Sequence, residues 1–160
     1  MSTNRARVLL WTDNTAAYLD AVKAAGAAGI GLAIAQRFAE MAARLIPQWE
    51  IMDYAHDNKV DAPSGTVREL AARLGRVRAP LTPVSVADTI GIKETRGGNL
   101  AGTQVHAVRL PGFVISAEVI FGMPDQKLTI RHDSGSSARP YVDGALIAIR
   151  KVHALVGVHR

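Results

Sequence analysis

The sequence predicts an α+β domain with a mixed or antiparallel sheet of about four to five strands and flanking helices. Two stretches, residues 32–46 and 138–156, carry apolar side chains at helical spacing. Between them, short strand-like runs come in one block separated by turn residues. Strands joined by hairpins favour this class over a doubly wound fold, in which strands and helices alternate.

The first half of the chain supplies three predicted elements. Residues 8–25 are expected to form a strand and then a helix, because the apolar "RVLLW" ends at the helix-start signal "TDNT". Residues 32–46 are expected to form an amphipathic helix that ends before Pro47. Residues 49–55 alternate like a strand. Residues expected to be available for burial in these last two elements are Leu32, Ile34, Ala35, Phe38, Met41, Ala42, Leu45, Trp49, Ile51 and Met52.

The second half begins with a helix and continues with the strands. Thr66 and Glu69 have the spacing of a capping box that would open a helix over residues 67–74, and Gly75 would stop it. The four strand candidates are residues 84–92, 103–110, 113–121 and 127–132, with turn signals at "RGGN", "LPG" and "GMPD".

Composition narrows the function classes. The formal charge is +5, but the arginines are scattered and there are few aromatic residues, so no nucleic-acid groove is predicted. No run approaches the roughly 20 apolar residues of a membrane span, and the N-terminus is unlike a signal peptide. With no cysteine and no ligand spacing among the histidines, no metal site is expected. We therefore predict a cytoplasmic protein without nucleic-acid or membrane partners.

A glycine-rich stretch invites comparison with dinucleotide-binding turns. Gly26, Gly29 and Gly31 precede a predicted helix, and Asp53 follows at about the distance of the acid that contacts a ribose. However, the spacing is Gly-x-x-Gly-x-Gly rather than Gly-x-Gly-x-x-Gly, and helix-like residues precede it. We predict a helix end with close packing at the next helix start, and no bound cofactor.

The segment "HDNKVDAPSGT", residues 56–66, carries the strongest motif. It resembles the signature Glu-x-His-His-x-x-Lys-x-Asp-Ala-Pro-Ser-Gly-Thr of dihydrodipicolinate reductases, enzymes of lysine biosynthesis. The likeness continues in family order through "VHAVRLPGFVISAEVIFG", "LTIRHDS" and "ARPYVDGALIAIRKV", and covers residues 32–158. The resemblance implies the fold of the family's C-terminal substrate domain.

The resemblance also implies roles for individual residues. Ser64, Gly65 and Thr66 would bind a carboxylate of a cyclic dicarboxylate at a helix start, where free amides and the helix dipole favour an anion. Lys59 would act as general acid or electrostatic partner, and His56 would contact substrate and could serve as a base. Residues whose match implies substrate binding also include Arg139, for which an ion pair is an equally open interpretation.

Two departures from the family shape the functional prediction. Ala55 stands where the family has the histidine usually given an acid-base role, and too few residues precede the signature for the family's nucleotide domain. We therefore expect a truncated relative: one domain, residues 1–160, with residues 1–28 as a strand-helix remnant or lid. It would bind a small carboxylated, perhaps cyclic, molecule.

The predicted activity is proton-transfer chemistry without a nicotinamide cofactor, such as dehydration, isomerisation or cyclisation, in a specialised biosynthetic pathway. One alternative is a non-catalytic assembly subunit, and another is a reductase that borrows a cofactor domain in trans. The family typically forms tetramers through the sheets of this domain, so the resemblance implies a homo-oligomer.

Overall fold

The computed structural model describes residues 29–137, 142 and 146 of the chain. By its contacts the chain divides into two compact units, one of Met1–Ile34 with Ser137–Arg160 and one of Ala35–Ser136. The second unit contains the whole sheet. The elements predicted over residues 8–25 and 138–156, and the predicted role of Arg139, lie outside the described residues and stay predictions.

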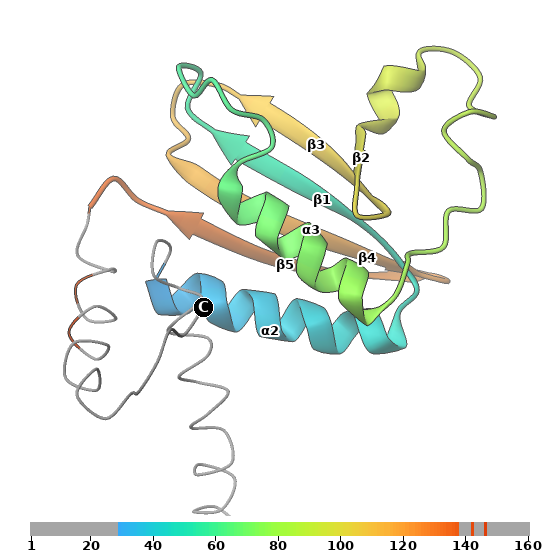
Figure 1. The fold of residues 1–160 in the computed structure, drawn as a ribbon, viewed down its shortest axis with the longest axis horizontal. Helices are drawn as coiled ribbons and strands as arrows, with labels where there is room; N and C mark the ends of the chain where they lie inside the picture. The colour runs from blue at the N-terminus through green and yellow to red at the C-terminus, as the bar shows by residue number, and fades with distance from the viewer. Residues whose placement is uncertain (1–28, 138–141, 143–145, 147–160) are drawn as a thin grey trace, which may run out of the picture. The chain divides into compact units, whose positions relative to one another are not determined.

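A five-stranded mixed sheet with two helices forms the described part, which confirms the predicted α+β class (Figure 1). The strand order is β2-β3-β1-β4-β5. Central β1 pairs parallel to β3 and antiparallel to β4, and the other pairs are antiparallel. The strands are β1 (Gln48–Ala55), β2 (Gly98–Leu100), β3 (Thr103–Arg109), β4 (Ile115–Met123) and β5 (Gln126–Ser134).

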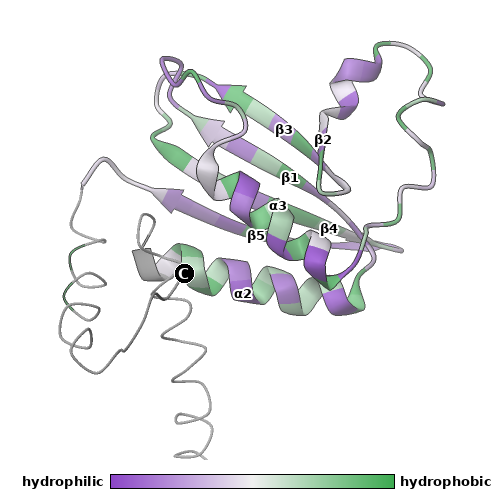
Figure 2. Cartoon of the chain, viewed as in Figure 1, coloured by the Kyte–Doolittle hydropathy of each residue, from purple (hydrophilic) through white to green (hydrophobic). Residues whose placement is uncertain are grey.

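Helices α2 (Gly29–Leu45) and α3 (Gly65–Val77) cover one face of the sheet. Alternate residues of β1 point at the helices and are buried, beginning with Trp49 and Ile51. Phe121 of β4 pairs with Trp49 and is fully buried beside it. The outer strand β5 is mainly hydrophilic (Figure 2), as suits the edge of a sheet.

The predicted buried face of α2 is half wrong. Leu32 and Ala42 are buried as expected, whereas Phe38 and Leu45 are 55% and 83% exposed. The buried face is a row at the same helical spacing in which four of the six residues are alanines. Its members are Leu32, Ala33, Gln36, Ala39, Ala42 and Ala43. Phe38 and Leu45 therefore lie on the outer side of the helix, together with Ile34 and Met41.

The predicted strand over residues 84–92 does not form. These residues belong to a loop that leads to a short 3-10 helix, η1 (Lys93–Arg96), and Figure 1 shows this segment extending away from the sheet. The hydroxyl of Ser85 donates to Asp88 and accepts from the Asp88 amide, which closes a local turn. Ile90 is 99% exposed. This segment therefore has no buried apolar face that would stabilise strand pairing. The short β2 forms the edge strand instead.

The start and end of α3 also differ from the prediction. The N-cap is Ser64, whose hydroxyl accepts from the Val67 amide, so Thr66 lies inside the first turn and cannot cap the helix. The helix continues through Gly75 to Val77. A Cβ at Gly75 would lie 2.8 Å from the carbonyl oxygen of Ala101. This glycine therefore permits close packing against the β2–β3 turn and does not stop the helix.

Candidate functional site

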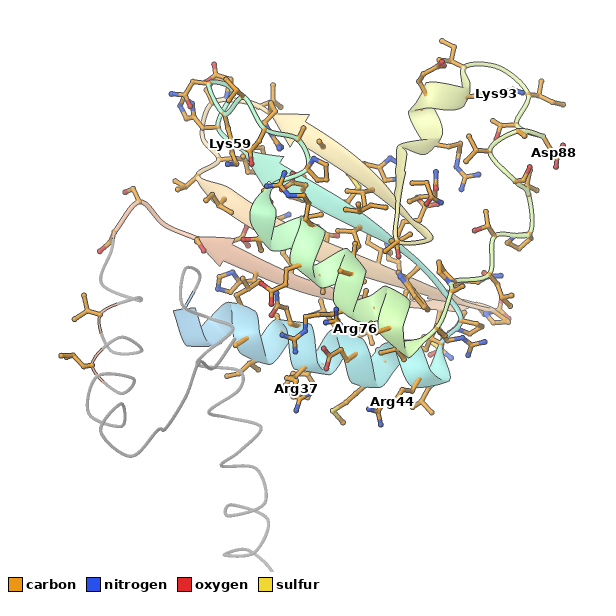
Figure 3. The ribbon with its side chains drawn as sticks, in the orientation of Figure 1. Arg37, Arg44, Lys59, Arg76, Asp88 and Lys93 are labelled. Atoms are coloured by element: carbon orange, nitrogen blue, oxygen red, sulfur yellow. The ribbon has the colours of Figure 1, made fainter. Side chains whose placement is uncertain are left out.

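The segment with the strongest motif, residues 56–66, connects the carboxyl end of β1 to the start of α3. We call it the 56–66 loop. Figure 3 shows Lys59 in this loop at one end of the sheet, whereas Arg44 lies at the far end of α2. The loop thus brings its charged side chains to a helix N-terminus, as the motif predicts.

The helix N-terminus offers two backbone donors. Among the described residues, the amides of Gly65 and Thr66 have no hydrogen-bond partner, as expected for the first positions of a helix. Gly65 is exposed and Thr66 is half-buried. The partial positive charge of the helix end favours an anion here.

Ser64 is placed differently from its two neighbours. It is 2% exposed, and both its amide and its hydroxyl donate to the carboxylate of Asp53, over 2.7 and 2.8 Å. Its polar groups are therefore already bonded within the protein. The role of Ser64 in ligand binding stays a prediction, and the contacts seen here give it a part in shaping the helix start.

Lys59 contributes the loop's ammonium group. Its Nζ lies 2.5 Å from Oδ1 of Asp61, and its side chain is 27% exposed. The Lys59 amide donates to the carbonyl of His56 over 3.1 Å, which closes a turn in the loop. Arg68 adds a second positive charge beside the helix start: it donates to the Pro63 carbonyl over 2.8 Å. Two cationic side chains, Lys59 of the loop and Arg68 of α3, therefore belong to the same segment as the free amides.

The pairing of Lys59 with Asp61 predicts a measurable titration shift. The hydrogen bond from Lys59, followed by its charge, holds the pKa of Asp61 below the ordinary value of 3.8. Any contribution of this pair to stability is therefore present above pH 3.8 and is lost as the pH falls through the lowered pKa. We expect Lys59→Met to raise the pKa of Asp61 toward 3.8, as followed by NMR of the side-chain carboxyl.

A matched control for this titration is Lys93→Met. Lys93 is the first residue of η1, its ammonium group donates to the carbonyl of Ala87, and Figure 3 shows it well apart from Lys59. This change removes one positive charge without touching the pair, so the Asp61 titration should not move. An Asp61 pKa that is the same in the wild type and in Lys59→Met would show that the pair does not form in solution.

His56 lies on the outer side of the loop. Its Nδ1 is 2.6 Å from Oδ1 of Asp57, and its side chain is 48% exposed. The same nitrogen accepts a hydrogen bond from the Asn58 amide over 3.4 Å, so both contacts of Nδ1 are with the two residues that follow His56. The preceding residue, Ala55, is fully buried at the end of β1. Its methyl group offers neither a proton donor nor an acceptor.

Sequence reasoning missed a buried polar network below the loop. Asp53 is fully buried, and the Arg109 guanidinium lies 2.8 Å from its Oδ2. Asp53 is therefore occupied and cannot contact a ribose, which removes the second half of the dinucleotide comparison. The sequence contained one signal for this network. Asp53 is an acid at one of the alternate positions of β1 that are buried, and a buried acid needs a partner.

A cavity of about 530 Å³ lies on the β3 side of the loop. It is bordered by Pro63, Glu94 and Val105, and by His106, whose Nε2 is 2.7 Å from a Glu50 carboxylate oxygen. Neither Lys59 nor His56 lines it. Among the described residues no three histidine or carboxylate side chains are grouped as metal ligands, and no helix is long and apolar enough to cross a membrane.

Comparisons with known proteins agree on one family. The family model described as dihydrodipicolinate reductase, C-terminus, matches residues 31–159. A 4-hydroxy-tetrahydrodipicolinate reductase of Desulfitobacterium hafniense is 44% identical over 126 residues, which are 79% of this chain and 47% of that protein. The reductase of Moorella thermoacetica is 45% identical over 130 residues, 81% of this chain and 48% of the relative. The chain thus spans about half the length of these relatives.

A solved structure shows the same fold. The dipicolinate-bound dihydrodipicolinate reductase from Paenisporosarcina sp. TG-14 matches with a TM-score of 0.69 and 32% sequence identity. The match covers 79% of this chain and 48% of that one. The predicted likeness to a reductase C-terminal domain is therefore confirmed.

Proposed function

Because this chain belongs to the dihydrodipicolinate reductase C-terminal family, we propose that it is a substrate domain that binds a small cyclic dicarboxylate of the dipicolinate type. The 56–66 loop is the proposed binding segment. The structural relative from Paenisporosarcina is described as bound to dipicolinate, which supports this class of ligand. The full reaction of the relatives is not part of this proposal, because the chain matches about half of their length.

One observation carries the proposal: the two unbonded amides of Gly65 and Thr66 lie in the same short loop as the Lys59 ammonium group. A carboxylate can accept from the amides at the helix N-terminus, where the helix dipole also favours it. In this proposal Lys59 neutralises negative charge on the bound molecule or donates a proton to it. Together these groups would recognise an anion.

Binding of pyridine-2,6-dicarboxylate to the full chain tests the proposal. We expect Lys59→Ala to weaken binding by tenfold or more, because a hydrogen bond to a charged group contributes roughly 1.5–3 kcal/mol. Isothermal titration calorimetry gives the Kd, and ligand-induced thermal stabilisation gives an independent value.

The matched control is again Lys93, the first residue of η1. Lys93→Ala removes the same charge from a position outside the loop and should leave the Kd unchanged. Equal affinity of the wild type and Lys59→Ala would remove Lys59 from the site. A wild type that shows no stabilisation with millimolar dicarboxylate would refute the proposed function.

Proton-transfer chemistry without a nicotinamide is the second candidate. The resemblance gives the position of Ala55 to the acid-base histidine of the reductases, and its buried methyl group supports this candidate and a non-catalytic role equally. In a dehydration, the ring hydroxyl would leave with a proton from Lys59 while a ring proton passes to His56. NMR of 4-hydroxy-tetrahydrodipicolinate incubated with the protein alone tests this. A dehydrated product formed no faster than with Lys59→Ala would exclude it. The predicted cytoplasmic location and homo-oligomeric state stay predictions.

A further inference from the structure

Arg109, the last residue of β3, joins three separate segments of the chain. Its Nη2 donates to Oδ2 of Asp53 and to the carbonyl of Asp61, each over 2.8 Å. Its Nη1 donates to the carbonyls of Asp53 and Val108, over 3.2 and 3.0 Å. One guanidinium group therefore holds β1, the end of β3 and the 56–66 loop in a fixed relation.

Both groups proposed to bind the ligand are attached to this network. Asp53 accepts from the amide and the hydroxyl of Ser64, the N-cap of α3, and so fixes where the helix and its free amides begin. On the other side, Arg109 holds the backbone of Asp61, whose carboxylate pairs with Lys59. The amides and the ammonium group thus owe their relative placement to the same buried ion pair.

The geometry of the guanidinium makes this role hard to replace. All four of its Nη hydrogens are directed to oxygen atoms in a planar fork, whereas the buried Nε has no partner. The position of Arg109 therefore follows from the oxygens of β1, β3 and the loop. A lysine keeps the charge, but its single ammonium group cannot reach the same set of acceptors.

We propose that Arg109 and Asp53 are positioning residues, which hold the 56–66 loop in the conformation that binds a dicarboxylate. This inference rests on the proposed function for the identity of the ligand. The claim about the conformation of the loop does not depend on the proposed function, because that conformation can be measured without ligand. The two claims can therefore fail separately.

Hydrogen–deuterium exchange of the full chain tests the loop. We expect Arg109→Lys to speed exchange in residues 56–68 by tenfold or more, while exchange in β4 and β5 stays as in the wild type. The bond that fixes Asp61 is lost, and Asp53, which holds Ser64, loses its guanidinium partner. Arg73→Lys is the matched control. Arg73 is another half-buried arginine paired with a carboxylate, that of Glu40, but it joins α3 to α2 away from the loop.

Calorimetry with pyridine-2,6-dicarboxylate then tests the consequence for binding. Arg109→Lys should raise the Kd by tenfold or more, and Arg73→Lys should lower the Tm without changing the Kd. A merely structural role for Arg109 would lower the Tm and leave both the Kd and the loop exchange unchanged, and this result would overturn the inference.

One further outcome separates the two claims. If Arg109→Lys speeds exchange in the loop but the wild type does not bind the dicarboxylate, Arg109 fixes the loop conformation and the proposed ligand is refuted. Where Arg109→Lys does not fold, the double variant Asp53→Asn with Arg109→Met removes both charges together and leaves neither one buried alone. It is measured in the same two assays with the same expected results.

Discussion

Replacing Asp53 with alanine is expected to lower the free energy of unfolding by roughly 3–5 kcal/mol, the usual cost of removing one partner from a buried ion pair. Asp53 is fully buried and accepts from Arg109 and from two donors of Ser64. Without its carboxylate, the guanidinium group loses its charged partner and the N-cap loses the group that holds it. Urea unfolding followed by circular dichroism measures the change.

The control for Asp53 is an acid of the same size at the surface. Asp133 pairs with Arg131, but its side chain is 59% exposed. Exposed ion pairs contribute roughly 0–1 kcal/mol, so Asp133→Ala should have a small effect. If Asp53→Ala costs no more than Asp133→Ala, the buried network does not hold the domain together, and the argument that it fixes the loop fails with it.

The candidate site shows what a motif can and cannot predict. The 56–66 loop was found because its residues are contiguous, and the structure places Lys59, Gly65 and Thr66 together in it. Arg109 was missed because it lies 48 residues after Asp61 in the chain and joins it only through the parallel pairing of β1 with β3. A contact of this kind depends on the sheet order, which local patterns do not specify.

The fold was predictable where one pattern dominated. Strands β1, β3, β4 and β5 follow from alternation and turn residues, and α2 follows from helical spacing. Residues 84–92 misled because β-branched residues favour strands only where they can be buried, and here Ile90 is exposed. On α2 two rows of residues have the same spacing, and the one with smaller side chains was not recognised as the buried one. Only packing against the sheet distinguishes Ala39 and Ala43 from Phe38 as core residues.

Phe121→Ala is expected to destabilise the domain by roughly 3–5 kcal/mol, through the lost burial of the ring and the cavity it leaves. Phe121 is fully buried at the centre of the core, and its ring centroid lies 5.8 Å from that of Trp49. Trp49 is itself fixed by a hydrogen bond from its indole nitrogen to Thr103 on β3. The rigid neighbour cannot move in to fill the space, which places the expected cost at the upper end of the range.

Phe38→Ala removes the same side chain from the outer side of α2, where the residue is 55% exposed. Surface substitutions usually change stability by less than about 0.5 kcal/mol, so this variant should unfold at nearly the same urea concentration as the wild type. The pair therefore tests the orientation of α2 as well as the core. A large loss in Phe38→Ala would mean that the outer row of α2 is covered in the intact protein, and a small loss in Phe121→Ala would mean that the helices do not pack on the sheet as described.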